Sequence, residues 1–281
     1  MDRIRREVLT ATAATAAVTV AQSALAQPAS GASRSGFYEK NGVRIRYQEV
    51  GSGFPLLALP GRGLNSQIAG WSSHAIDPME THKDDFRIIA MDQRNATGGQ
   101  STGPVPVDKP WDAYADDQLG MMDHLGIGKF LVYGNCMSAL FALKLIERAP
   151  DRVLAAVLAQ PVGYQPEFPD QMYNHVVKTW AVEYRRTHPT FSEADAVKMA
   201  TNMFRSPADF TYVVSREFVK NCQTPLYVLP DQTQAHSYKV AIEVASLAPN
   251  ASVNVYPWMQ PPELRARTAE RVRVFLKTHQ G

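Results

Sequence analysis

Short apolar runs alternate with longer amphipathic segments along most of the chain. A short apolar run bounded by turn residues is typical of a buried strand, whereas apolar residues that recur every three or four positions are typical of a helix. The strands predicted in this way are 43–50, 54–59, 86–91, 129–133, 153–159, 225–229 and 253–256. The predicted helices are 111–125, 139–148, 238–247 and 263–278. Because strands and helices alternate, the sequence predicts an α/β fold in which crossover helices join parallel strands.

The alternation stops for a stretch in the second half of the chain, after Gly163. Large apolar residues continue there at helical spacing, namely Tyr173, Trp180, Tyr184, Met199, Met203 and Phe204. We therefore predict a helical insertion over residues 163–222. It separates two parts of one α/β core, which cover residues 37–162 and 223–281.

Residues 1–26 have the pattern of an export signal and not of a folded element. A charged start contains Arg5-Arg6, a weakly apolar Ala/Thr run follows, and Ala24-Leu25-Ala26 resembles a cleavage site. The paired arginines resemble those of a twin-arginine signal. An uncleaved membrane-anchoring helix is the alternative, but the apolar run is shorter than the ~20 residues that a span needs. We expect a periplasmic or secreted protein with no stable membrane insertion after signal cleavage.

Charge and composition exclude several classes of function. The chain has 29 Lys+Arg and 27 Asp+Glu, and both signs are interspersed, so no basic surface for nucleic acid is predicted. With 45% hydrophobic and 20% charged residues, the composition is that of an ordinary globular protein. No metal-ligand spacing, phosphate-binding loop or dinucleotide fingerprint occurs in the sequence. We expect a small-molecule substrate and a site without metal or cofactor.

Cys136 stands at the junction between a predicted central strand and the helix that follows it. Gly134 and Ser138, two positions before and two after it, are small enough for a sharp turn that projects the Cys136 side chain. The amides and dipole of a helix N-terminus lower the pKa of a thiol and so increase the population of the nucleophilic thiolate. The alternative is a small cysteine packed beneath the helix. The position favours a nucleophile.

Five segments carry a resemblance to a known family. They are Leu59-Pro60-Gly61-Arg62-Gly63, Asp92-Gln93-Arg94-Asn95 through Ser101, Asp123-His124-Leu125-Gly126, Gly134-Asn135-Cys136-Met137-Ser138 and Ala149-Pro150-Asp151-Arg152-Val153. In this order and spacing, the chain resembles the α/β-hydrolase family over about residues 37–279. The resemblance implies a mostly parallel eight-stranded sheet with flanking helices and a helical cap inserted after strand 6.

The resemblance also implies roles for individual residues. Cys136 stands where the family usually has a serine nucleophile, and in this respect the chain is similar to dienelactone hydrolases. The backbone amides of Met137 and Arg62 would form the oxyanion hole. Asp231, which follows the seventh strand, matches the family's acid. The family places its base in the loop after the last strand, but residues 255–262 contain no histidine.

A base must therefore come from elsewhere, and His236 is the candidate. It lies on the loop after the seventh strand, where Asp231 or Asp92 would orient it. The alternative is that His236 only stabilises its loop. The other histidines are assigned to helix, cap and tail positions, and His74 and His82 to surface loops.

The two cysteines are not expected to form a disulfide. Cys136 follows the C-terminal end of one parallel strand, and Cys222 precedes the N-terminal end of another. At ~3.3 Å per residue, a strand of about five residues separates them by more than the ~7 Å that a disulfide bridges. Cys136 is expected to be a free thiol.

Aromatic residues of the insertion predict an apolar pocket, for which we name Trp180, Tyr173 and Phe204 together with Asp92. The expected activity is cofactor-free hydrolysis of a small, apolar ester, lactone, thioester or related carbonyl compound, with Cys136, His236 and Asp231 as the catalytic residues. Two alternatives stay open. One is a catalytically degenerate binding protein, and the other is a lyase or isomerase on the same fold.

Overall fold

The computed structural model describes residues 33–205 and 210–281. The predicted export signal over residues 1–26 lies outside the described residues. A single eight-stranded sheet has the order β1-β2-β4-β3-β5-β6-β7-β8. The strands are β1 (Arg34–Lys40), β2 (Val43–Val50), β3 (Phe54–Leu59), β4 (Phe86–Met91), β5 (Phe130–Asn135), β6 (Val153–Ala159), β7 (Leu226–Leu229) and β8 (Ala251–Val253). Only the β1/β2 and β2/β4 pairs are antiparallel, which confirms the predicted mostly parallel sheet.

The two edges of the sheet differ from the sequence prediction. Residues 34–40 form β1, which pairs only with β2 and buries only Tyr38, so it has no apolar run that could have predicted it. At the other edge, β8 ends at Val253 although the apolar run continues to Tyr256. Val255 is 64% exposed, so this run does not reflect burial. The outermost strands are therefore the ones whose positions the pattern predicts least well.

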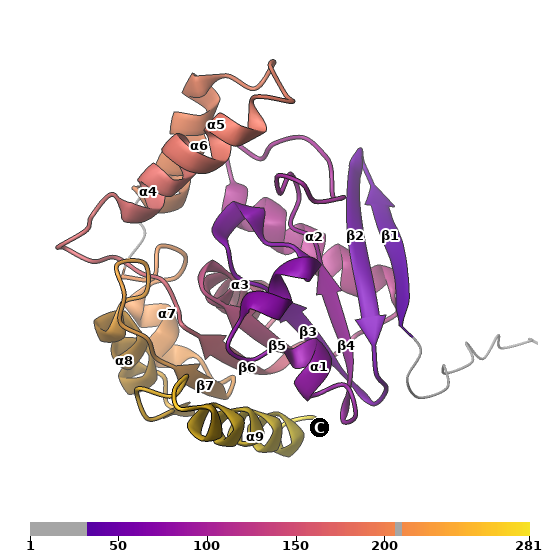
Figure 1. Ribbon diagram of the computed structural model, residues 1–281, viewed down its shortest axis with the longest axis vertical. Coiled ribbons are helices and arrows are strands. Elements are labelled where there is room, and N and C mark those ends of the chain that lie inside the picture. Colours follow the sequence, from indigo (N-terminus) through magenta and orange to yellow (C-terminus); the bar gives the residue numbers. More distant parts are fainter. Residues whose placement is uncertain (1–32, 206–209) are drawn as a thin grey trace, which may run out of the picture.

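Helices cover both faces of the sheet (Figure 1). The helices of the core are α1 (Pro78–Thr81), α2 (Pro110–His124), α3 (Met137–Arg148), α8 (Tyr238–Leu247) and α9 (Pro262–Thr278). Successive strand residues point to opposite faces. Leu57 and Val132 pack on one face with residues of α2, α3 and α8, whereas Leu56 and Leu131 pack on the other with residues of α9. Two apolar layers thus hold the central strands in place.

The described residues between β6 and β7 form four helices and one π-helical turn, and the first part of this segment projects beyond the sheet in Figure 1. The elements are α4 (Gln171–His175), η3 (Val176–Trp180), α5 (Ala181–Tyr184), α6 (Glu193–Phe204) and α7 (Arg216–Asn221). Two indoles join it to the core. Trp180 Nε1 donates to the Asn95 carbonyl at 3.2 Å, and Trp111 Nε1 donates to the Met203 carbonyl at 3.1 Å.

Both cysteines are free thiols, as their places in the sheet led us to expect. Among residues 33–205 and 210–281, no helix combines the length and the apolar character needed to cross a bilayer.

Candidate active site

Cys136 occupies a strained turn between the central strand β5 and helix α3. Its φ and ψ are 56° and −123°, a combination that non-glycine residues rarely adopt. Gly134 allows the turn, because a Cβ at that position would overlap the carbonyl oxygen of Ser138. The Ser138 hydroxyl donates to the Pro60 carbonyl at 2.7 Å. This bond fastens the turn to the loop that follows β3.

Two backbone amides lie at the Cys136 thiol, that of Met137 in α3 and that of Arg62 in the loop after β3. Gly61 passes so close to the turn that an added Cβ would lie 3.1 Å from the Cβ of Cys136. Arg62 follows in a left-handed conformation, with φ 84° and ψ 26°. The backbone amides of Met137 and Arg62, which the family resemblance implies as the oxyanion hole, both interact with the sulfur. They are placed to stabilise negative charge that develops beside it.

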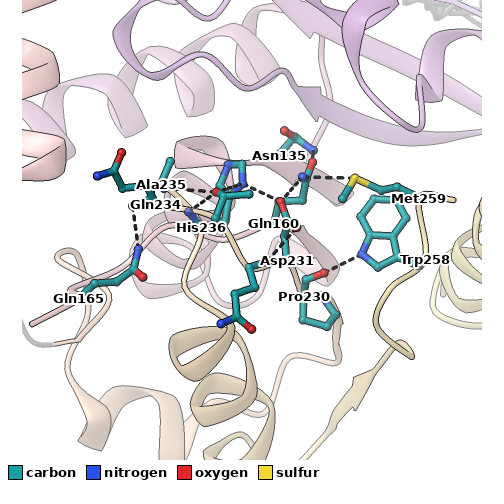
Figure 2. A network of polar contacts seen from close by, with 12 residues as sticks. Asn135, Gln160, Gln165, Pro230, Asp231, Gln234, Ala235, His236, Trp258 and Met259 are labelled. Atoms are coloured by element: carbon teal, nitrogen blue, oxygen red, sulfur yellow. Dashed lines mark hydrogen bonds and ion pairs between the residues drawn. The ribbon is translucent and has the colours of Figure 1, made fainter. Parts of the chain in front are cut away.

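His236 and Asp231 form the second half of the site (Figure 2). Nδ1 of the imidazole lies 2.8 Å from Oδ2 of Asp231. The Cys136 side chain also interacts with the imidazole and raises its pKa. Asp231, rather than Asp92, is therefore the residue that orients His236. The Asp92 carboxylate accepts instead from the backbone amides of Ile68 and Gln100, each at 3.0 Å.

The three groups shift one another's pKa values. Burial opposes the Cys136 thiolate, but His236 and the two backbone amides outweigh it and lower the pKa of the thiol. Burial likewise opposes the imidazolium, but the bonds to Asp231 and Cys136 raise the pKa of His236 to about 9. Burial would raise the pKa of Asp231, yet hydrogen bonds led by that of His236 lower it. At neutral pH these directions favour a thiolate–imidazolium pair beside an ionised carboxylate.

Gln160 and Asn135 complete this network, and sequence reasoning missed both as site residues. Gln160 follows β6 with a φ of 51°, and its Nε2 donates to Oδ2 of Asp231 at 2.7 Å. Asn135 Nδ2 in turn donates to Oε1 of Gln160 at 3.1 Å. Asn135 ends β5 within the motif around Cys136, and Gln160 directly follows β6, so a position at a strand end was the signal in the sequence that could have found them.

Cys136, His236, Gln160 and Asn135 line a cleft of about 540 Å³. The loop after β8, in which no histidine occurs, lends Met259 and Gln260 to its wall. Most of the side chains that line it are polar.

The four residues predicted to line the pocket do not line this cleft, so that prediction is corrected. Asp92 is buried and bonded to backbone amides, as described above. Trp180 is fully buried, stacks on Tyr184 and fastens the insertion to the core. Phe204 is buried against Trp111 and Tyr212, and Tyr173 lies under the guanidinium of Arg205. Their helical spacing reflects packing of the insertion.

Two histidines assigned to surface loops from the sequence lie elsewhere. His82 is buried beside Phe86, with 1% of its surface exposed. His74 lines the cleft, and its Nε2 accepts a hydrogen bond from the Gly61 amide at 2.8 Å. Burial lowers the pKa of His74, and the charges of Arg62 and His236 lower it further. A bond to the Gly70 carbonyl raises this pKa but does not offset the other effects. A neutral imidazole therefore holds the loop that carries the Arg62 amide.

Replacing His74 with leucine is expected to slow turnover of an activated ester about tenfold, mainly through kcat. The Gly61 amide would lose its acceptor, and an unpaired buried donor costs about 1–3 kcal/mol. The expected measurement is a comparison of kcat and KM between the two proteins. The His74→Gln variant keeps an acceptor and should recover part of the rate. Equal kcat values in the leucine variant and the natural protein would contradict this role.

No group of three or more histidine, cysteine, aspartate or glutamate side chains in the described part of the chain is arranged to hold a metal ion.

Comparison with known proteins places the chain in a family. The family model for the alpha/beta hydrolase fold matches residues 55–257. The chain is 30% identical over 122 residues to 2-hydroxymuconate semialdehyde hydrolase from Pseudomonas sp. strain CF600, a match that covers 43% of this chain and 41% of that protein. It is 32% identical over 95 residues to the putative carbamate hydrolase RutD from Agrobacterium fabrum, covering 34% of this chain and 36% of the relative. The matches thus span about two fifths of these relatives.

Solved structures agree in fold. Naproxen esterase from Bacillus subtilis superimposes with a TM-score of 0.63 at 20% identity, over 87% of this chain and 92% of that one. A meta-cleavage product hydrolase from Pseudomonas fluorescens IP01 superimposes with a TM-score of 0.61 at 21% identity, over 84% and 95% of the two chains. With the sheet order described above and a family model that matches most of its length, the chain belongs to the α/β-hydrolase fold family.

Proposed function

We propose that the chain is a cofactor-free hydrolase that uses Cys136 as its nucleophile on an ester, lactone, thioester or related carbonyl compound. One observation carries the proposal. The Cys136 thiol is in contact with both an imidazole that is bonded to a buried carboxylate and two backbone amides. That set supplies a nucleophile, a proton carrier, its orienting acid and an oxyanion hole. The names of the relatives, which include hydrolases, support the same class of reaction.

In the first half of the reaction, the Cys136 thiolate attacks the carbonyl carbon and a C–S bond forms. The carbonyl electron pair moves to oxygen, where the amides of Met137 and Arg62 receive the negative charge. When the oxyanion collapses, the C–O bond of the ester breaks. The imidazolium of His236 gives its proton to the departing alkoxide, so an alcohol leaves and a thioester remains.

In the second half, water replaces the alcohol. The water oxygen attacks the thioester carbonyl while neutral His236 takes a proton from that water. The second oxyanion collapses with cleavage of the C–S bond, which releases the carboxylic acid and restores the thiolate–imidazolium pair. Throughout the cycle, Asp231 keeps the imidazole in one orientation and stabilises its charged form. Gln160 donates to the same Asp231 oxygen that faces the imidazole.

The test is the pH dependence of iodoacetamide alkylation, followed by peptide mass at each cysteine. Cys136 is expected to react with an apparent pKa well below the ~8.5 of a free thiol, because its thiolate is favoured by His236 and the two amides. Reactivity should rise as the pH passes upward through that lowered value. Ester turnover should fall again above about 9, where His236 loses the proton that the leaving group needs.

Cys222 is the internal control for this measurement. It is 5% exposed, and burial raises the pKa of its thiol. It should stay unmodified while the protein is folded. If Cys136 is as unreactive as Cys222, or titrates like a free thiol, the nucleophile is refuted and the chain is better explained as a binding protein on this fold.

A further inference from the structure

Two arginine side chains line the cleft next to Cys136. Arg62 comes from the loop after β3, and Arg265 from the first turns of α9. Within residues 33–205 and 210–281, neither guanidinium makes an ion pair or a side-chain hydrogen bond. Arg94, in contrast, is buried and paired with Asp117. The two cleft arginines thus have donors available for a ligand.

Acidic side chains do not offset this charge at the cleft surface. No aspartate or glutamate of the described segments lines the cleft. The nearest carboxylate identified in the site, that of Asp231, is 4% exposed and is already bonded to His236 and Gln160. The pKa of His74 is lowered mainly by burial, and the positive charge of Arg62 lowers it further. The cleft is therefore positively charged where a substrate would enter.

The backbone at Arg62 gives a second, independent observation. Its φ of 84° lies in the left-handed region, which costs a residue with a Cβ roughly 1–2 kcal/mol and which glycine adopts freely. The next residue, Gly63, also has a positive φ, at 62°. The backbone conformation thus favours glycine at position 62 as well. A long cationic side chain at a position that disfavours any side chain points to a use for its charge.

We propose that the natural substrate is an acidic carbonyl compound, one that bears a carboxylate which Arg62 and Arg265 bind while Cys136 attacks its reactive carbonyl. A guanidinium presents its N–H groups as a planar fork that matches the two oxygens of a carboxylate. This inference rests on the proposed function. It changes the expected substrate from an apolar molecule to an anionic one.

Iodoacetate and iodoacetamide test the proposal without knowledge of the substrate. They alkylate the same sulfur with the same leaving group and differ in charge. The measured quantity is the ratio of the iodoacetate rate to the iodoacetamide rate at Cys136. In the natural protein we expect this ratio to be about tenfold higher than for free cysteine, and to fall as salt screens the arginines.

The variant that carries both Arg62→Gln and Arg265→Gln should lower this ratio by about fivefold. The natural protein and this variant both keep His236, so the attraction of its imidazolium for iodoacetate cancels in the comparison. Arg267→Gln is the matched control, since Arg267 is exposed on the same helix but does not line the cleft. The variant with lysine at both positions keeps the charge and should retain a high ratio. A change of less than twofold in the glutamine variant, or an equal change in the control, overturns the proposal.

The same data separate this proposal from the proposed function. If iodoacetamide reacts at low pH but the rate ratio equals that of free cysteine, the nucleophile stands and the anion site is refuted. If neither reagent reacts, the nucleophile itself is refuted. A pair of p-nitrophenyl esters, one ending in a carboxylate and one in the corresponding amide, gives the catalytic counterpart. The natural protein should prefer the acidic ester in kcat/KM, and the glutamine variant should lose most of that preference.

Discussion

Hydrolysis of a p-nitrophenyl ester is expected to fall by more than about a thousandfold when Cys136 is replaced by alanine. Alanine removes the sulfur that forms the covalent bond, and the amides of Met137 and Arg62 then have no nucleophile beside them. The side chain is only partly buried, so the variant should remain folded. Initial rates and a thermal unfolding curve, measured on the same preparation, check both statements.

Cys222→Ala provides the comparison for this loss. Cys222 is buried in the apolar core just after α7, and its sulfur makes a weak contact with the Thr224 carbonyl at 3.8 Å. That change should cost some stability, because it empties part of a packed site, and should leave the rate per folded molecule unchanged. Comparable rates in Cys136→Ala and the natural protein would show that turnover does not pass through the sulfur.

The second large effect is expected at Asp231. Replacing it with asparagine should reduce ester hydrolysis by about 10³- to 10⁴-fold, since an amide no longer fixes the tautomer of His236 or stabilises its charge. The pKa of the imidazole should fall from about 9, because the bond to the Asp231 carboxylate is its largest stabilising influence. The pKa of the Cys136 thiol should then rise, since it depends on the same imidazolium. NMR titration of His236 and the alkylation profile of Cys136 report the two shifts.

Asp92→Asn is the matched control for Asp231→Asn. Asp92 is equally buried, but its carboxylate accepts from the Ile68 and Gln100 amides and not from an imidazole. This variant should lose stability without moving the alkylation profile of Cys136. An unchanged profile in Asp231→Asn, or the same shift in both variants, would remove Asp231 from the acid–base pair.

Local patterns were sufficient to predict the central sheet and the nucleophile turn. Strands β3 to β6 are buried on both faces, so their apolar runs are continuous and bounded by turn residues. Cys136 could be placed because its turn needs small neighbours at fixed spacing, which the sequence displays. His236 could be proposed because it lies on the same loop as Asp231, directly after β7. These features depend on residues close to one another in the chain.

Contacts between distant segments could not be predicted in the same way. His74 lies in a stretch of loop and short helix without periodicity, and its bond to Gly61 depends on how that stretch folds back. Gln160 reaches Asp231 across 71 positions of sequence. The aromatic residues of the insertion gave a clear helical pattern, but a pattern of burial is the same whether a ring contacts the protein core or a substrate. The pattern therefore predicts Trp180 and Phe204 in the pocket, whereas the structure shows that they pack the insertion on the core.

Asp231 and His236 belong to one short loop after β7, and this has a mechanical consequence. The loop closes on itself through Thr233, and its ends are fixed by the Trp258 bond to the Pro230 carbonyl and by the bridge between Val162 and His236. The acid and base therefore belong to one short, internally bonded loop, and the contact between them lies within that loop. Gln165, which lies between β6 and α4, donates to the Gln234 carbonyl of this loop at 3.0 Å. The distance between base and sulfur therefore depends on how this loop packs against the segment after β6, whereas the contact between acid and base lies within the loop itself.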